Sequence, residues 1–168
     1  MTSNEPIAIC FVCLGNICRS PLAEGVFQDL VIQAGLEERI LIHSAGTGGW
    51  HVGSPPDTRM KATAQARGIH LQSRAQQFQP GDFKRFDLVL AMDRSNKSSL
   101  ESMGSPAQAE QKLRLFRSFD PKNGGDLDVP DPYYGGGSGF DHVFEIVHRT
   151  CPNILNFVRQ EFLHQHEG

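Results

Sequence analysis

The nine residues Cys13-Leu14-Gly15-Asn16-Ile17-Cys18-Arg19-Ser20-Pro21 join a continuous apolar run to a stretch with helical spacing. The preceding run, residues 7–12, has the length and uninterrupted apolarity of a buried strand. After the nine residues, apolar side chains recur at steps of three and four, which is typical of a helix. Ser20 suits the N-cap of that helix and Pro21 its first position. The pattern predicts a strand, a loop and a helix, with the loop ending at the helix N-terminus.

Three further strands and several helices are predicted along the chain. The strands fall at residues 39–44, 87–92 and 112–116, and the helices at about 22–34, 55–68, 95–103 and 143–162. Gly104-Ser105-Pro106 should end the third helix, and Pro152 should kink the last helix or divide it in two. Residues 117–139, rich in Gly, Asp and Pro, are expected to form a long loop, which in a compact domain is usually functional or disordered. The alternation predicts an α/β fold with a mainly parallel sheet, helices on both faces and a ligand site beyond the C-terminal ends of the strands.

The composition indicates one compact domain over residues 1–168, with 1–6 and 164–168 as its polar ends. The net charge is −3 and like charges do not cluster, which argues against nucleic acid as a partner. There is no apolar run of membrane-spanning length and no N-terminal signal segment, so we expect no membrane association and a cytoplasmic location. The four cysteines do not suit a disulfide framework and are expected to be reduced. We expect a monomer.

The nine-residue loop carries a cysteine and an arginine separated by five residues. Backbone N–H groups in a tight turn, the dipole of the following helix and the guanidinium of Arg19 can together hold a tetrahedral oxyanion. The same positive field favours the thiolate form of Cys13, which is the nucleophilic form. Gly15 lets the backbone approach the anion closely, and Asn16 tolerates a left-handed conformation. The loop therefore predicts a phosphate site with a nucleophilic cysteine beneath it.

These residues, in this order, resemble the signature of the low molecular weight protein tyrosine phosphatases. The resemblance covers about residues 7–163 and includes Ser44-Ala45-Gly46-Thr47, Trp50-His51-Val52-Gly53, Pro56-Asp57-Thr58-Arg59, Ala91-Met92-Asp93 and Val129-Pro130-Asp131-Pro132-Tyr133-Tyr134-Gly135. It implies a four-stranded parallel sheet in the order 2-1-3-4 with flanking helices. It also implies an enzyme that hydrolyses phosphotyrosine in proteins and other aryl phosphates through a phosphocysteine, without a cofactor or metal. Inorganic phosphate and other oxyanions would bind as product or inhibitors.

By this resemblance, Cys13 is the nucleophile, Arg19 clamps the phosphate oxygens, and Asp131 acts first as general acid and then as general base. Ser20 would donate a hydrogen bond to the leaving thiolate, while Asn16 and Ser44 hold the shape of the loop. The residues implied to contact the substrate are Leu14, Gly15, Asn16, Ile17, Cys18, Ser20, Trp50, Tyr133 and Tyr134. Ser73 stands where many family members place a loop-bracing histidine, and its hydroxyl can still hydrogen-bond there.

Two residues near the loop each have two interpretations. Cys18 packs within the loop or, as in resembling proteins, forms a reversible disulfide with Cys13 that prevents over-oxidation. Asp93 caps the helix after the third strand or lines the site. Cys10 and Cys13, three residues apart in a strand, should point to opposite faces and therefore do not suit a zinc or redox pair.

Three other functions are alternatives. Thioredoxin-coupled arsenate reductases of the same fold need additional resolving cysteines, and residues 70–150 contain none. Protein-arginine phosphatases tend to carry Thr where this chain has Ile17, whose bulky apolar side chain suits an aryl phosphate. A non-catalytic phosphopeptide-binding module would need neither Cys13 nor Asp131. The sequence therefore favours a protein-tyrosine phosphatase.

Overall fold

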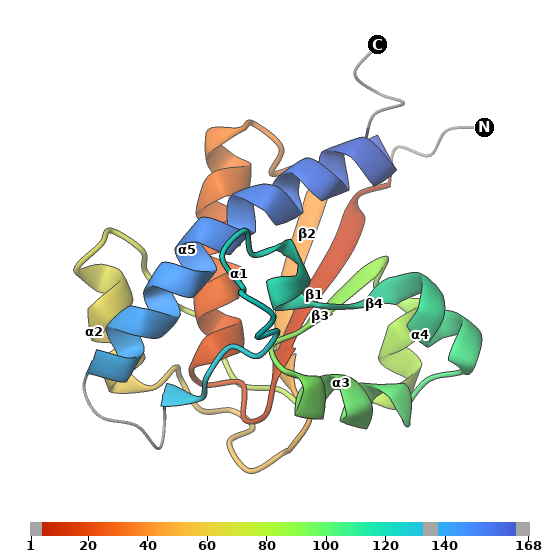
Figure 1. The fold of residues 1–168 in the computed structure, drawn as a ribbon, viewed down its shortest axis with the longest axis horizontal. Helices are drawn as coiled ribbons and strands as arrows, with labels where there is room; N and C mark the ends of the chain where they lie inside the picture. Colours follow the sequence, from red (N-terminus) through yellow and green to blue (C-terminus); the bar gives the residue numbers. More distant parts are fainter. Residues whose placement is uncertain (1–4, 133–137, 164–168) are drawn as a thin grey trace.

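The computed structural model describes residues 5–132 and 138–163. Within them, four strands form a parallel sheet in the order β2-β1-β3-β4, as predicted (Figure 1). The strands are β1 (Ile7–Cys13), β2 (Ile40–Gly46), β3 (Leu88–Ala91) and β4 (Leu113–Leu115). β1 is central, and its last residue, Cys13, pairs with Gly46 of β2. The nine-residue loop therefore leaves the sheet at its C-terminal edge, where parallel α/β folds bind ligands.

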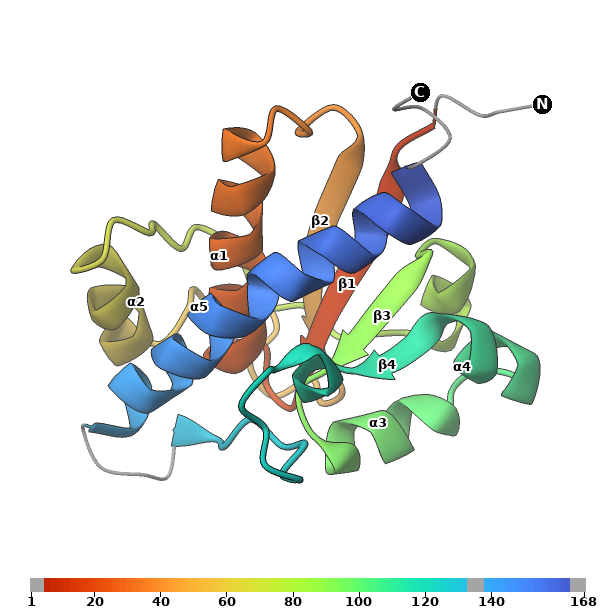
Figure 2. The same ribbon diagram turned by 45° about the horizontal axis from the view of Figure 1, so that its top comes forward.

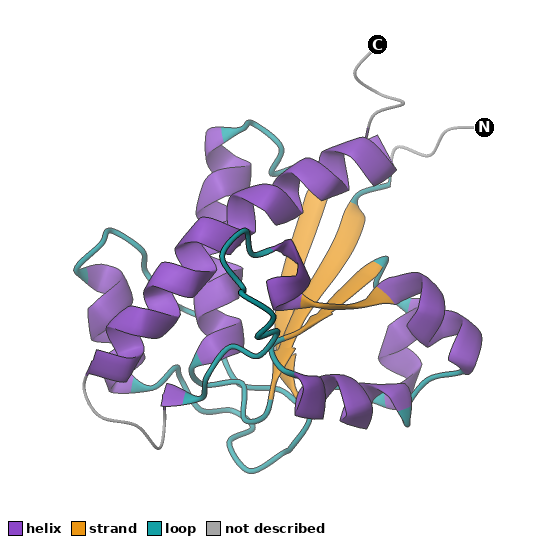
Figure 3. Ribbon diagram, in the orientation of Figure 1, coloured by secondary structure: helices purple, strands orange, loops and turns teal. Residues whose placement is uncertain are grey.

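Helices cover both faces of this sheet (Figure 3). On one face lie α1 (Arg19–Gln33) and α5 (Ser138–Val158), with α2 (Thr58–Gln65) beside them. Near the β3-β4 side of the sheet lie α3 (Arg94–Glu101) and α4 (Pro106–Lys112). Short helical turns, η1 (Pro80–Lys84), η2 (Phe116–Phe119) and η4 (Arg159–Leu163), complete the described elements.

Side chains of β1 alternate between two hydrophobic clusters. Phe11 and Cys13 belong to the cluster that includes α1 and α5 residues, whereas Cys10 and Val12 belong to the cluster around Phe83. This alternation confirms that Cys10 and Cys13 point to opposite faces, because successive side chains of a strand alternate. The four cysteines are free and buried.

The expected start of α1 was wrong. The helix begins at Arg19 with Cys18 at the N-cap position, so Ser20 is not the N-cap and Pro21 does not occupy the first position. The reason is that the Ser20 hydroxyl lies 3.0 Å from the sulfur of Cys13. A side chain committed to the loop cannot also cap the helix.

Two other helices differ from expectation. α4 was not predicted, because Pro106 was considered only as the end of a helix; it is instead the first residue of the next one, where a missing N–H costs nothing. Ser105 and Gln108 form a capping box around it. α5 runs as one helix through Pro152, so the predicted division in two is wrong. Buried side chains on either side of Pro152 offset the cost of the missing hydrogen bond.

In the part of the chain that the structure describes, none of the helices combines the length and the apolarity needed to cross a membrane.

Candidate active site

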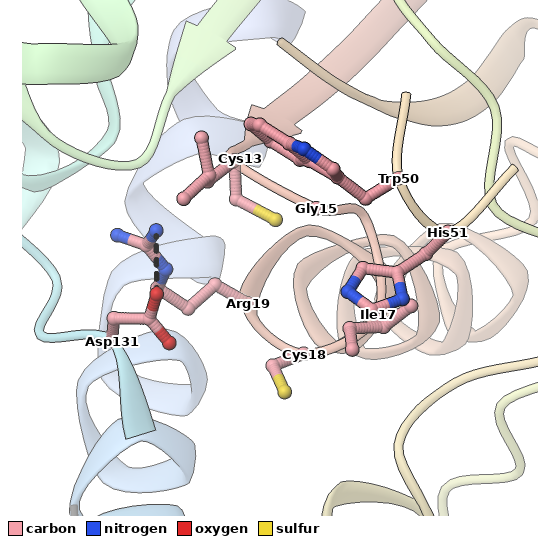
Figure 4. Close-up of a pocket in the computed structure, with 9 residues that line it drawn as sticks. Cys13, Gly15, Ile17, Cys18, Arg19, Trp50, His51 and Asp131 are labelled. Atoms are coloured by element: carbon pink, nitrogen blue, oxygen red, sulfur yellow. Dashed lines mark ion pairs between the residues drawn. The ribbon is translucent and has the colours of Figure 1, made fainter. Parts of the chain in front are cut away.

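A cavity of about 340 Å³ opens at the C-terminal end of β1. Figure 4 shows Arg19 and Asp131 on one side of it and Ile17 and His51 on the other. The cavity is lined by Cys13, Leu14, Gly15, Ile17, Cys18, Arg19, Trp50, His51 and Asp131. Most of the residues that the sequence singled out are therefore gathered here, although they come from segments more than 100 positions apart.

The sulfur of Cys13 lies in a polar cradle at the bottom of this cavity. Its side chain is 3% exposed, Ser20 Oγ lies 3.0 Å from Sγ, and the backbone N–H of Asn16 donates to Sγ at 3.3 Å. Asn16 has φ of 59°, a left-handed conformation that asparagine tolerates better than most residues. The sulfur thus contacts one backbone N–H and one hydroxyl group of its own loop.

The side chain of Asn16 connects the loop to the neighbouring strand. Its Nδ2 donates to Ser20 Oγ at 2.7 Å and to Ser44 Oγ at 3.0 Å, while its Oδ1 accepts the backbone N–H of Gln76 at 3.0 Å. Because Asn16 is buried, these bonds satisfy groups that would otherwise be costly to desolvate. They fix the loop in one shape.

A carboxylate that the sequence reasoning missed extends this network. Ser44 Oγ donates to Glu24 Oε1 at 2.6 Å, and Ser73 also hydrogen-bonds to Glu24. Ser73 thus lies behind the loop and acts on it through Glu24 and Ser44. Burial raises the pKa of Glu24, and the hydrogen bonds from the two serines oppose that shift only in part.

Arg19 lies in the first turn of α1 with 3% of its side chain exposed. Its Nη1 donates to Asp93 Oδ2 at 2.6 Å and to the carbonyl oxygen of Val129 at 2.9 Å. Its Nη2 lies 3.7 Å from Asp131 Oδ2. Burial alone would lower the pKa of Arg19, but the charges of Cys13, Asp93 and Asp131 outweigh it and raise the pKa above its ordinary value. The guanidinium is therefore permanently charged and held in place.

Asp93 caps α3, which is one of the two functions that the sequence left open; it does not line the cavity itself but pairs with Arg19, which does. Its Oδ2 pairs with Arg19, while its Oδ1 accepts the backbone N–H of Asn96 and so caps α3. The position of Asp93, just beyond β3, was a usable signal, because the ends of parallel strands meet at one edge of the sheet.

The walls of the cavity are largely apolar. Trp50 is 73% exposed, and Leu14 is partly exposed beside it. His51 was quoted in a motif but given no role, yet it lines the cavity; a Cβ on Gly15 would lie 2.9 Å from His51 Cδ2, so only glycine lets the ring pack this close. The two other aromatic residues expected in this wall, Tyr133 and Tyr134, lie outside the described residues.

Cys18 lines the same cavity as Cys13 and is almost fully buried. Burial raises the pKa of the Cys18 thiol strongly, and the negative charges of Asp57, Cys13 and Asp131 raise it further. Cys18 is therefore a neutral thiol in the same cavity as Cys13. Within the described ranges, no group of three or more His, Cys, Asp or Glu side chains has the arrangement of a metal site.

Comparisons with known proteins agree with this geometry. Residues 8–165 match the family model described as low molecular weight phosphotyrosine protein phosphatase. A Streptomyces coelicolor protein named low molecular weight protein-tyrosine-phosphatase is 47% identical over 154 residues, 91% of this chain and 94% of that protein. A Synechocystis protein named as a putative member of the same class is 44% identical over 91% of this chain and 97% of its own length.

Solved structures give the same result. The crystal structure of a protein tyrosine phosphatase from Entamoeba histolytica superposes with a TM-score of 0.87 at 34% identity, covering 92% of this chain and 97% of that one. The family model covers nearly the whole chain. This chain belongs to the low molecular weight phosphotyrosine protein phosphatase family.

Proposed function

We propose that this chain hydrolyses phosphotyrosine in protein substrates, and other aryl phosphate monoesters, through a phosphocysteine on Cys13. The observation that carries the proposal is the convergence of Cys13, Arg19 and Asp131 on one cavity with an apolar wall. A thiol that only binds phosphate needs no carboxyl group beside the leaving oxygen, whereas an enzyme that expels a phenolate does.

In the first step, the Cys13 thiolate attacks phosphorus and the bond between phosphorus and the phenolic oxygen breaks. Asp131 gives its proton to that oxygen, so a neutral phenol leaves. Arg19 binds two of the non-bridging oxygens, whose charge is redistributed in the transition state. Its ion pair with Asp93 sets the plane of the guanidinium for this contact.

In the second step, the Asp131 carboxylate takes a proton from water while the water oxygen attacks phosphorus. The sulfur–phosphorus bond breaks, inorganic phosphate forms and Cys13 returns as a thiolate. Ser20, 3.0 Å from the sulfur, donates a hydrogen bond to the departing thiolate. No cofactor is needed, because both proton transfers are made by Asp131.

The cavity wall favours an aromatic leaving group. Leu14, Ile17 and Trp50 present apolar surface on which a phenyl ring can stack. The guanidinium of a phosphoarginine would bring a polar, strongly hydrated group against the same apolar surface, which includes the Ile17 side chain. Phosphotyrosine is therefore the preferred substrate.

Cys18 is proposed to protect the nucleophile. Hydrogen peroxide oxidises the Cys13 thiolate to a sulfenic acid; attack by the Cys18 sulfur then forms the Cys13–Cys18 disulfide and releases water. Two cysteines lining one cavity support this step. Peroxide-inactivated enzyme should recover with dithiol, and a Cys18→Ser variant that recovers equally well would contradict the role. A reducing, cytoplasmic compartment is proposed with it, since all four cysteines are free. A monomer is proposed as the default state of the chain.

Turnover of a phosphotyrosine peptide by the wild type, Cys13→Ser and Asp131→Asn tests the function. Cys13→Ser should abolish turnover while phosphate still binds, and Asp131→Asn should lower kcat/KM by roughly 10²- to 10⁴-fold. Unimpaired turnover by Cys13→Ser would rule out a phosphocysteine. A higher kcat/KM for phosphoarginine than for phosphotyrosine would make the chain an arginine phosphatase, and phosphopeptide binding without turnover by the wild type would make it a binding module.

A further inference from the structure

A buried ion cluster lies at the base of the loop that carries Asp131. The carboxylate of Asp120 is 0% exposed and accepts hydrogen bonds from Arg117 Nε at 2.9 Å and from Arg149 Nε and Nη2 at 2.8 and 3.0 Å. The backbone N–H of Lys122 donates a further bond at 2.8 Å. Arg149 belongs to α5 and Arg117 to η2, so Asp120 joins the start of the loop to two rigid elements.

Arg117 also binds the far end of the same loop. Its Nη1 donates to the carbonyl oxygen of Asp128 at 2.8 Å and lies 3.5 Å from Asp126 Oδ2. Residues 120 and 128 are therefore joined through one guanidinium, while most residues between them are exposed. Figure 2 shows this segment, teal, passing α5 after β4. The ion pairs and hydrogen bonds of Arg117 hold the two ends of the loop together, since the loop has little apolar contact of its own.

The residues that follow are fixed directly to the site. Arg94 binds the carboxylate of Asp128 through its backbone N–H at 2.8 Å and its guanidinium at 3.2 Å. Val129 donates its N–H to the carbonyl oxygen of Met92 at 2.8 Å and accepts from Arg19 at 2.9 Å. Asp131 follows two residues later. The closed loop and the anchors at Asp128 and Val129 therefore act together on where Asp131 lies relative to the sulfur of Cys13.

We propose that Asp120, held by Arg117 and Arg149, is a positioning residue for the proton transfers made by Asp131; this inference rests on the proposed function. A carboxylate taken fully out of water persists only where cations and N–H groups replace the water. An apolar residue at this point would take from Arg149 and Arg117 the carboxylate that they share, and Arg117 would then hold only the far end of the loop. The pKa of Asp120 agrees: burial would raise it, but the bonds from Arg149, Lys122 and Arg117 lower it to about 2.

A purely structural role makes different kinetic predictions. If Asp120 only stabilised the fold, its loss would lower kcat/KM equally for every substrate. If it positions Asp131, the loss should fall on substrates whose leaving oxygen needs a proton and spare those that leave as stable anions. Phenyl phosphate is of the first kind and 2,4-dinitrophenyl phosphate of the second. The value of kcat/KM includes cleavage of the phosphorus–oxygen bond. The kcat/KM for phenyl phosphate divided by that for 2,4-dinitrophenyl phosphate therefore measures how much the proton donor accelerates the reaction.

The experiment measures this ratio in Asp120→Asn, Arg149→Gln and Asp131→Asn. Asp131→Asn should lower it by about 10²-fold or more. The two cluster variants should each lower it about tenfold, since small misplacements of a reacting group cost up to about 10²-fold. Arg67→Gln is the matched control: it breaks an ion pair at 2.9 Å between Arg67 and Asp141 of α5, neither of which belongs to residues 117–131, and should leave the ratio unchanged.

A double variant makes the test specific. If Asp120 acts through Asp131, adding Asp120→Asn to Asp131→Asn should not lower the ratio further. An unchanged ratio in both cluster variants, with Asp131→Asn showing its loss, would overturn the positioning role alone. An unchanged ratio in Asp131→Asn would overturn the proposed proton donor and this inference together. Should Asp120→Asn fail to fold, Arg149→Gln carries the same test, because its side chain is 27% exposed and its loss is milder.

Discussion

Arg19 Nη1 lies 2.6 Å from Asp93 Oδ2, so the guanidinium in the cavity is held by a residue just beyond the end of β3. The same carboxylate caps α3 through its other oxygen. Arg19 is the first residue of α1, and Asp93 is the N-cap of α3. One ion pair thus fixes the Arg19 guanidinium, proposed to bind the phosphate oxygens, relative to both helices.

Asp93→Asn separates these two functions of the side chain. Asparagine caps helices about as well as aspartate, so α3 should remain intact, but the charge that orients Arg19 is lost. A hydrogen bond to a charged group is worth about 1.5–3 kcal/mol, and we expect kcat/KM for aryl phosphates to fall about tenfold or more. Asp93→Ala should lose in addition about 1 kcal/mol of the free energy of unfolding. An unchanged kcat/KM in Asp93→Asn would show that Arg19 does not depend on this partner.

Glu24→Gln tests the carboxylate behind the loop. Burial raises the pKa of Glu24, so the folded protein keeps this proton to a higher pH than the unfolded chain does. The stability contributed by protonation is present below the ordinary pKa of glutamate and lost as pH rises through the raised value. Glutamine keeps an acceptor for Ser44, so the free energy of unfolding of Glu24→Gln, relative to wild type, should increase between pH 4 and pH 7. Denaturant titrations at the two pH values measure it, and a difference independent of pH would refute the assignment.

The pKa of Asp120 is shifted in the opposite direction from that of Glu24. Its pKa of about 2 is below the ordinary value for aspartate, so its contribution is present above about pH 4 and is lost as pH falls toward 2. A pKa shift of this size corresponds to about 2 kcal/mol of the free energy of unfolding. Acid unfolding of Asp120→Asn should therefore be shallower than that of the wild type between pH 4 and 2, although the variant is less stable at pH 7. If the acid unfolding curves of the wild type and Asp120→Asn were parallel between pH 4 and 2, the pKa of Asp120 would not be depressed in the folded protein.

Gly48→Ala should displace the tryptophan at the cavity mouth. A Cβ at position 48 would lie 1.8 to 2.5 Å from ring atoms of Trp50, so the ring has to move. Because Trp50 is the only tryptophan, its fluorescence reports the movement directly. KM for a phosphotyrosine peptide should rise several-fold with little change in kcat. Gly81→Ala, where no atom lies within 4 Å of the added Cβ, is the control; equal emission from the wild type and Gly48→Ala would show that the ring tolerates the methyl group.

The sequence was most informative where local pattern determines structure. The run before Cys13 predicted a buried central strand, and the left-handed conformation found at Asn16 is one that its residue type was expected to tolerate. The parallel sheet followed from alternating elements. The start of α1 was placed wrongly because Ser20 has two possible partners, a helix N–H and the Cys13 sulfur, and only the folded loop decides between them.

Side-chain partners from distant segments could not be predicted in the same way. Glu24 lies in a helix whose spacing gives no sign that one carboxylate points to Ser44, 20 residues away. The pairing of Asp120 with Arg149 joins residues 29 apart in sequence, and nothing in either segment specifies it. Asp93 was predicted in part. Its position after a strand placed it at the correct edge of the sheet, but nothing in the sequence identified Arg19 as its partner.

The central claim, a covalent phosphocysteine on Cys13, is tested most directly by trapping it. Asp131→Asn can expel 2,4-dinitrophenolate without an acid but lacks the base for the second step, so the intermediate should accumulate. Mass analysis of the peptide containing Cys13, after rapid quenching during turnover, should show one added phosphoryl group in a large fraction of the enzyme, and none in Cys13→Ser. Turnover with no phosphoryl group on that peptide, or with the group on another residue, would contradict the account.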